Sequence, residues 1–223
     1  MAESLFAAYA RTRERVVALI AATPEDELNR VVPACPAWTV HDLLAHVVSI
    51  PAALSTGRRP TGDIGEWLLE LVDERSTQPA KELSQEWQGL DKELDAMLSG
   101  PSALLFGDLA VHEHDFRGAL GRPDHAALEI EAMLPRTIAA FSTPLREAGL
   151  APIEVRAGDQ VWRSHDGEPG WTLIVDPWTA VRALNSRRTA GELYALASEG
   201  DASDYLPILD AHLPLPAESL GEV

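Results

Sequence analysis

Two residues four positions apart have the types and spacing to share a metal ion. Asp108 and His112 lie in a stretch with helical spacing of apolar residues, so both side chains should project from one face of a helix at adjacent turns. Their neighbours on that face are mostly apolar, and burying an unpaired carboxylate or imidazole costs free energy. A divalent cation with one further ligand would remove that cost. From spacing alone, the alternative is a buried Asp–His hydrogen-bonded pair without a metal.

His46 is the candidate for that further ligand. It lies on the apolar side of a separate predicted helix, beside Leu43 and Val47. Two histidines and one carboxylate leave a coordination position open for water or substrate, as in catalytic rather than structural zinc sites. The same donors also suit nickel or iron. The residue pattern therefore predicts a candidate metal site made of His46, Asp108 and His112.

Other residues with reactive side chains receive no catalytic role. His114 should point away from His112 and be exposed, because two positions along a helix correspond to about 200° of rotation. His41 lies in the first turn of its helix and is expected at the surface. Cys35 is the only cysteine of the chain, and it stands between prolines, where we expect it to pack rather than to act as a nucleophile.

The helix that carries the first candidate ligand has a well-marked start. Thr39 and Asp42 are spaced as a short relative of the capping box, while Trp38 and Leu43 have the spacing of a hydrophobic staple. This helix should run to about residue 50, because Pro51 marks a kink or a boundary.

The rest of the chain is predicted to form a helical part followed by a mixed part. Apolar spacing predicts helices, and prolines predict an extended segment before the capped helix; the expected helices cover residues 3–22, 65–98, 102–119 and 125–148, and the extended segment covers 32–37. Beyond residue 150, β-branched and aromatic runs between Gly and Asp turns predict strands at 152–156, 160–163 and 171–175, then short helices near 177–186 and 189–198.

The predicted fold class is therefore α+β. We expect an all-helical domain over residues 1–149 and a small α+β domain over residues 150–223. The last stretch contains Pro207, Pro214 and Pro216, and we expect extended or frayed chain there.

The charge balance makes several classes of partner improbable. The 223 residues include 18 basic and 35 acidic side chains, a formal net charge of −17. This charge repels phosphate backbones and anionic bilayers, so we expect neither nucleic acid nor membrane partners. The lone cysteine and an N-terminus without a signal-like pattern predict a cytoplasmic location. The oligomeric state is left open between monomer and homodimer.

Two segments that contain the candidate ligands carry a family resemblance. Residues 32–46, VPACPAWTVHDLLAH, resemble a signature of the maleylpyruvate isomerase-like, mycothiol-dependent enzymes, a branch of the DinB-like helical bundles. Residues 108–121 are similar to the second metal motif of that family, an acidic residue four before a histidine, then Asp and a closing Leu-Gly. Residues 182–206 are similar to the C-terminal domain of the same proteins, so the resemblance covers nearly the whole chain.

The resemblance implies a four-helix DinB-like bundle that holds a divalent metal, usually zinc, through His46, Asp108 and His112. The characterised isomerases of the family have Glu at the position of Asp108. In the family, the open coordination position is thought to take the thiol of mycothiol, a low-molecular-weight thiol of actinobacteria. The thiolate would add to an electrophilic carbon of a small substrate, and it would then either leave, giving isomerisation, or stay, giving S-conjugation.

The predicted C-terminal domain contributes one further candidate. Arg187 and Arg188 could clamp a carboxylate of the substrate or cofactor, and the alternative is a helix-end charge or a structural ion pair. The expected function is thus a metal- and mycothiol-dependent transferase or isomerase. Two alternatives stay open, a non-catalytic DinB-like protein that binds a small molecule and a metal-dependent enzyme that does not use the thiol.

Overall fold

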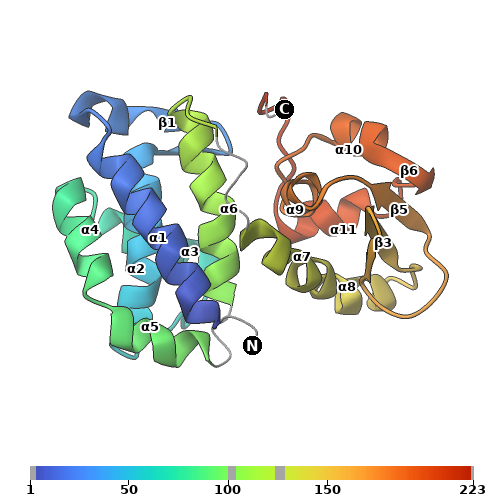
Figure 1. The fold of residues 1–223 in the computed structure, drawn as a ribbon, viewed down its shortest axis with the longest axis horizontal. Helices are drawn as coiled ribbons and strands as arrows, with labels where there is room; N and C mark the ends of the chain where they lie inside the picture. Colours follow the sequence, from blue (N-terminus) through green and yellow to red (C-terminus); the bar gives the residue numbers. More distant parts are fainter. Residues whose placement is uncertain (1–3, 100–103, 124–128, 222–223) are drawn as a thin grey trace. The chain divides into compact units, whose positions relative to one another are not determined.

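The chain divides into two compact units. A computed structural model describes residues 4–99, 104–123 and 129–221, and the chain folds as one unit over residues 1–124 and a second over residues 125–223. The first unit is helical apart from one short hairpin, and the second combines helices with a four-stranded sheet (Figure 1). The fold class is therefore α+β, as the sequence predicts.

The N-terminal unit is a four-helix bundle. Helices α1 and α2 each pack against α6 and against the consecutive short helices α4 and α5, which together take the fourth position, while α3 lies against α2 (Figure 1). Leucine, valine and aromatic side chains from these helices fill the core, among them Val16, Leu44, Trp87 and Phe106. The elements described in this unit are α1 (Leu5–Ala21), the 3-10 helix η1 (Glu25–Asn29), β1 (Val31–Val32), β2 (Cys35–Thr39), α2 (Val40–Ser55), α3 (Ile64–Asp73), α4 (Ala80–Gln88), α5 (Asp91–Leu98) and α6 (Leu104–Ala119).

Helix α2 begins as predicted and ends later than predicted. The Thr39 hydroxyl accepts a hydrogen bond from the Asp42 amide at 3.1 Å, and the Asp42 carboxylate accepts one from the Thr39 amide at 2.9 Å, which completes a capping box. The preceding residues form the antiparallel β1–β2 hairpin, in agreement with the extended segment expected there. Pro51 lies inside α2, which continues to Ser55, so residue 50 is not a boundary. A proline removes only its own amide donor, and the apolar packing of this helix outweighs that loss.

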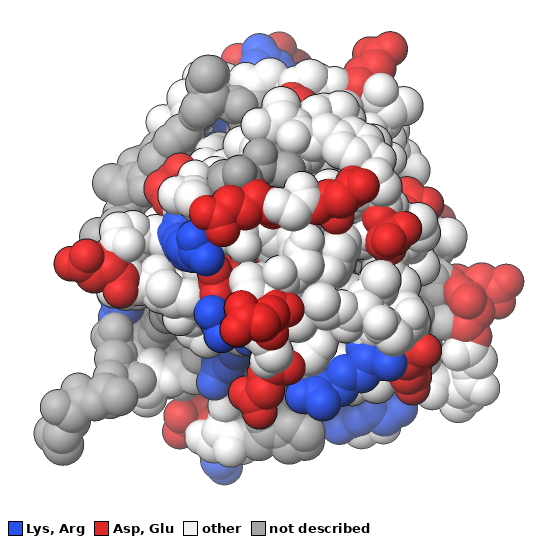
Figure 2. Space-filling view, turned by 90° about the vertical axis from the view of Figure 1, so that its right-hand side faces the viewer, with Lys and Arg blue, Asp and Glu red and all other residues white. Residues whose placement is uncertain are grey.

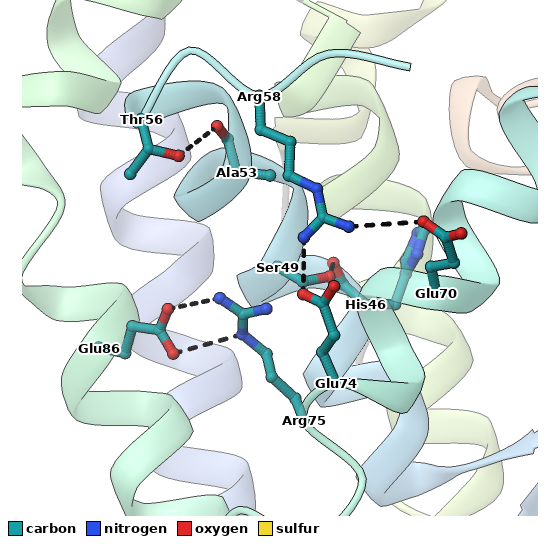
Figure 3. A network of polar contacts seen from close by, with 9 residues as sticks. All are labelled: His46, Ser49, Ala53, Thr56, Arg58, Glu70, Glu74, Arg75 and Glu86. Atoms are coloured by element: carbon teal, nitrogen blue, oxygen red, sulfur yellow. Dashed lines mark hydrogen bonds and ion pairs between the residues drawn. The ribbon is translucent and has the colours of Figure 1, made fainter. Parts of the chain in front are cut away.

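Ion pairs connect the end of α2 with α3, and the end of α3 with α4 (Figure 3). Arg58, just after α2, reaches Glu74 at 2.7 Å and Glu70 at 3.5 Å, and Arg75 reaches Glu86 of α4 at 2.7 Å. The hydrogen bond to Arg58 holds the pKa of Glu74 below its ordinary value. Because the Arg58 pairs are largely exposed, each contributes little stability.

The C-terminal unit has a mixed sheet in the order β4-β3-β5-β6. Strand β3 is antiparallel to β4 and parallel to β5, and β5 is antiparallel to β6. Its core is made mainly of apolar residues from the sheet and from α9, such as Val155, Trp171 and Val181. The elements described here are α7 (Glu129–Ala140), α8 (Ser142–Glu147), β3 (Ile153–Ala157), β4 (Gln160–Arg163), β5 (Trp171–Ile174), α9 (Pro177–Leu184), α10 (Ala190–Leu196), β6 (Ala197–Gly200) and α11 (Leu206–His212).

Three features of this unit differ from the sequence-based expectations. Helices α7 and α8 belong with the sheet, because α7 packs against α9 and β4, so the boundary between the two units falls near residue 124 rather than at 149. The segment near 189–198 is a helix only to Leu196 and then becomes strand β6, which pairs with β5. Residues 206–212 form α11 instead of extended chain, because Pro207 lies in the first turn, where its missing amide is tolerated.

The surface reflects the acidic composition of the chain. Figure 2 shows one face on which carboxylate side chains are widely spread and basic side chains are interspersed. In the described ranges, none of the helices combines the length and the apolar character that a membrane-spanning segment needs.

Candidate metal centre

The structure brings the three predicted ligands together. His46 comes from α2, and Asp108 and His112 come from α6, which packs against α2. The Nε2 atoms of His46 and His112 lie 3.5 and 3.4 Å from Oδ1 of Asp108, and one ligand atom from each residue lies within 4.8 Å of the others. Ligands about 2.0–2.1 Å from one tetrahedral zinc ion are about 3.4 Å apart. The donor types and these separations therefore fit a divalent cation.

The imidazole of His112 is oriented by a second carboxylate. Its Nδ1 lies 2.9 Å from Oδ2 of Asp115, one helical turn along α6, and the side chain of Asp115 is completely buried. Because an ionised carboxylate only accepts hydrogen bonds, this contact places a proton on Nδ1 of His112, and the other ring nitrogen, Nε2, faces Asp108. Carboxylate–histidine pairs of this kind orient the imidazole in metal sites and make it a stronger ligand.

The imidazole of His46 has different surroundings. Its Nδ1 is buried and has no hydrogen-bond partner within the described ranges. The indole of Trp38 lies against the ring, with centroids 4.6 Å apart and planes tilted by 37°. The rings of His46 and His112 are nearly perpendicular, with centroids 5.1 Å apart. The two imidazoles are thus held by different kinds of contact.

The carboxylates favour a positive charge at this place. Burial alone would raise the pKa of Asp108, but the neighbouring His112 and His46 hold that pKa well below its ordinary value. Burial alone would lower the pKa of His112, but Asp108 and Asp115 outweigh it and hold that pKa well above its ordinary value. A proton supplies the positive charge in the metal-free protein, and a bound cation would replace it.

Only one of the three candidate ligands has substantial contact with solvent. The side chain of Asp108 is 34% exposed, whereas those of His46 and His112 are 4% and 9% exposed. A small molecule would therefore approach the cluster from the side of Asp108.

Tyr9 is buried and accepts a hydrogen bond from Nε1 of Trp87 at 2.9 Å. Burial, and to a smaller extent the charge of Asp108, raises the pKa of Tyr9, so its hydroxyl stays neutral.

The prediction that His114 is exposed is wrong. Its exposed fraction is 6%, and the neighbouring Glu113 is also buried, because α6 packs against α1, α2 and β1 and so is covered on more than one face. Glu113 accepts two hydrogen bonds from Arg15 of α1, at 2.7 and 2.8 Å, and further ones from Arg117. This ion pair connects α1 to α6 next to the candidate ligand His112. His41 is half-buried, with Nε2 2.8 Å from the Gln78 carbonyl oxygen.

Cys35 lies beside the candidate centre. Its thiol forms a second group with His112 and Asp115, whose potential ligand atoms also lie within 4.8 Å of one another. The side chain is half-buried and forms no disulfide. The proline-rich segment gave no sign of this proximity, which comes from the β1–β2 hairpin folding against α6.

Arg187 and Arg188 lie in the C-terminal unit, just after α9. Both are buried, and each donates a hydrogen bond to a backbone carbonyl, Arg187 to Asn185 at 2.7 Å and Arg188 to Arg187 at 2.9 Å. The guanidinium of Arg188 also lies over the ring of Trp178, 5.4 Å from its centroid. A role of the two arginines as an anion clamp stays a prediction.

A comparison with protein-family models identifies the N-terminal unit. Residues 9–108 match the mycothiol maleylpyruvate isomerase N-terminal domain. The N-terminal unit belongs to this family. The matched region of the mycothiol maleylpyruvate isomerase domain includes His46 and ends at Asp108, four residues before His112. Comparisons with curated proteins and with solved structures found no match.

The match covers less of the chain than the sequence resemblance does. Residues 182–206 lie outside the region matched to the mycothiol maleylpyruvate isomerase domain, so the likeness there stays a prediction. Two residues of the site received no role in metal binding from the sequence. Asp115 could have been found, since a spacing of three places it on the same helix face as His112. Trp38 could not, because its contact with His46 depends on the path of β2.

Proposed function

We propose that this protein is a divalent-metal-dependent enzyme that uses a low-molecular-weight thiol, mycothiol, to isomerise a small electrophilic molecule or to transfer the thiol to it. His46, Asp108 and His112 are the proposed ligands. The proposal is supported by the family of the N-terminal unit and, above all, by one observation, the meeting of these three side chains from two helices within 4.8 Å.

The surrounding residues suit the site to a divalent cation and to a thiol that would bind that cation. Asp108 supplies negative charge that offsets a dication, and Asp115 accepts a hydrogen bond from Nδ1 of His112, so that Nε2 is the nitrogen that would face the cation. Three protein ligands leave a position open on the solvent-exposed side of Asp108. A bound zinc, nickel or iron ion would lower the pKa of a thiol ligand, so that the thiolate is present at neutral pH. We favour zinc.

The partners that we propose are a small electrophile and the thiol, and we propose neither a nucleic acid nor a membrane as a partner. We also propose a cytoplasmic location. Arg187 and Arg188 remain the proposed clamp for a carboxylate of either small molecule. Each donates a hydrogen bond to a backbone carbonyl, and Arg188 also lies over the face of Trp178; these contacts orient the guanidinium groups. Replacement by lysine would keep the charge and lose the planar fork, so it should weaken carboxylate binding.

The test begins with the metal. Protein as isolated should contain about one divalent ion per chain, and His112→Ala should lose it without unfolding, as judged by circular dichroism. A wild-type protein that neither carries nor takes up zinc, nickel or iron would overturn the metal-dependent function and favour the non-catalytic binding protein.

The second step separates the thiol-dependent enzyme from one that does not use the thiol. Mycothiol at 100 times its Kd should stabilise the metal-loaded protein by about 2.7 kcal/mol, a shift that a thermal melt resolves. The His112→Ala variant serves as the matched control and should not shift. Absence of a shift in the loaded wild type at millimolar mycothiol would refute the use of this thiol.

A further inference from the structure

Two imidazoles of the candidate centre are supported in different ways. The Nδ1 atom of a metal-binding histidine almost always donates to a carboxylate, a carbonyl or a water, and this contact fixes the ring. His112 follows the rule through Asp115, at 2.9 Å. His46 does not, because its Nδ1 is buried without a hydrogen-bond partner in the part of the chain that the structure describes. Among the described residues, support for the ring of His46 therefore comes from another kind of contact.

That contact is available from Trp38. Rotation about the last side-chain bond of a histidine is only weakly restricted by its own geometry, so a neighbour must select the angle. The Trp38 indole lies 4.6 Å from the His46 ring, centroid to centroid, at a tilt of 37°. A flat ring so close leaves room for only a narrow range of angles, and the observed one directs Nε2 toward Asp108 at 3.5 Å.

The backbone that carries the indole is fixed directly after Trp38. Trp38 is in β2, whose last residue, Thr39, pairs with Val31 of β1. Thr39 is also the first member of the capping box that begins α2, the helix carrying His46. The hairpin and the helix cap therefore fix the backbone directly after Trp38, and His46 follows about two helical turns later.

We propose that Trp38 is a positioning residue for the metal ligand His46, in the place that a hydrogen-bonding carboxylate takes for His112. The inference rests on the proposed metal site. It predicts that the two imidazoles have unequal support, since a carboxylate partner strengthens a ligand electronically and an aromatic neighbour only orients it.

The experiment measures the affinity of the full chain for zinc alone, by competition with a chromophoric chelator. Trp38→Met replaces the flat ring by a flexible side chain that can still fill the space, and Trp38→Phe keeps a flat ring. We expect Trp38→Met to raise the Kd for zinc about tenfold, the lower end of the effect known for residues that support metal ligands, and Trp38→Phe to restore most of the affinity.

Cobalt provides a readout that a general loss of stability would not move. The visible absorption of bound Co²⁺ depends on ligand geometry, so it should change in Trp38→Met and resemble the wild type in Trp38→Phe. Trp67→Leu is the matched control, because Trp67 is a buried tryptophan of the same unit that packs with Ala53 and Leu71. It should lower the melting temperature and leave the cobalt spectrum and the zinc Kd unchanged.

Each outcome decides between the proposals. A folded Trp38→Met with wild-type zinc affinity and cobalt spectrum overturns the positioning role and leaves the metal site intact, as does an equal loss of affinity in Trp67→Leu. Failure of the wild type to bind zinc or cobalt overturns the metal site itself. Should Trp38→Met not fold, Trp38→Leu is measured in its place with the same expectations.

Discussion

Replacing Asp115 by asparagine isolates the electrostatic support that this carboxylate gives to His112. The side chain is completely buried, and its Oδ2 lies 2.9 Å from Nδ1 of His112. Asparagine can still offer an oxygen at that distance, but it has no charge. A hydrogen bond to a charged group contributes about 1.5–3 kcal/mol and a neutral one about 0.5–1.5 kcal/mol. The difference of about 1–1.5 kcal/mol corresponds to a Kd for zinc that is about five to twelve times higher.

Asp115→Ala goes further, because it removes the acceptor altogether. We expect a loss of affinity approaching 100-fold, the upper end of what such partners contribute. Both variants are compared with wild type by zinc titration against a chelator near pH 7.5, with folding checked by circular dichroism. Asp73→Asn removes the same charge at an exposed position and serves as the control.

The test is the order of the four proteins by their Kd for zinc. The reasoning requires the Kd to rise from wild type and Asp73→Asn, which should be equal, to Asp115→Asn and then to Asp115→Ala. If folded Asp115→Asn bound zinc as tightly as wild type, the carboxylate would not support the ligand, and its role as the orienting partner of His112 would be refuted.

Three further predictions concern the stability of the two units. Burial alone would raise the pKa of Glu154, but Arg163 and Arg156 hold it below its ordinary value of 4.5; the stability this carboxylate gives is therefore present above pH 4.5 and is lost as the pH falls through the lowered value. Glu154→Gln should lower the free energy of unfolding by about 2 kcal/mol at pH 7, less than for a fully buried pair because both arginines are partly exposed. In urea unfolding at several pH values, the variant should lose less stability toward acid pH than the wild type does. An unchanged acid slope would contradict this. Gly200 has φ +84°, and a Cβ there would lie 2.0 Å from the Gly170 carbonyl oxygen. Gly200→Ala should therefore destabilise the protein by at least about 2 kcal/mol. A melting temperature equal to that of the wild type would show that the backbone can shift to make room. Thr39→Ala removes the cap of α2 and should cost about 1 kcal/mol in the same unfolding assay, with Thr56→Ala, after the end of the helix, as the control.

The sequence predicted best what depends on local spacing. The side chains of Asp108 and His112 were expected to be adjacent because residues four apart always share a helix face, and the cap at Thr39 followed from residue types three apart. The apolar character around His46 placed this residue on the inner face of α2. The convergence of the three side chains then needed only that α2 and α6 pack against each other.

The sequence-based predictions were wrong where contacts with several other elements decide the conformation or burial of a segment. His114 was expected at the surface because only one face of its helix was assigned to the core, whereas α6 is covered by three other elements. Strand β6 forms after a helix because pairing with β5 decides its conformation. Helix α11 forms although it contains Pro207 and is followed by Pro214 and Pro216. The contact between Trp38 and His46 depends on the hairpin, which a linear pattern does not describe.

The position of Cys35 allows a probe to be attached to the chain beside the candidate metal centre. Since no other residue of the 223 is a cysteine, a dye carrying a maleimide would attach at one point, at a sulfur within 4.8 Å of a ring nitrogen of His112. The speed of that labelling would therefore register whether a cation occupies the neighbouring imidazole, and it would do so without a substrate being known.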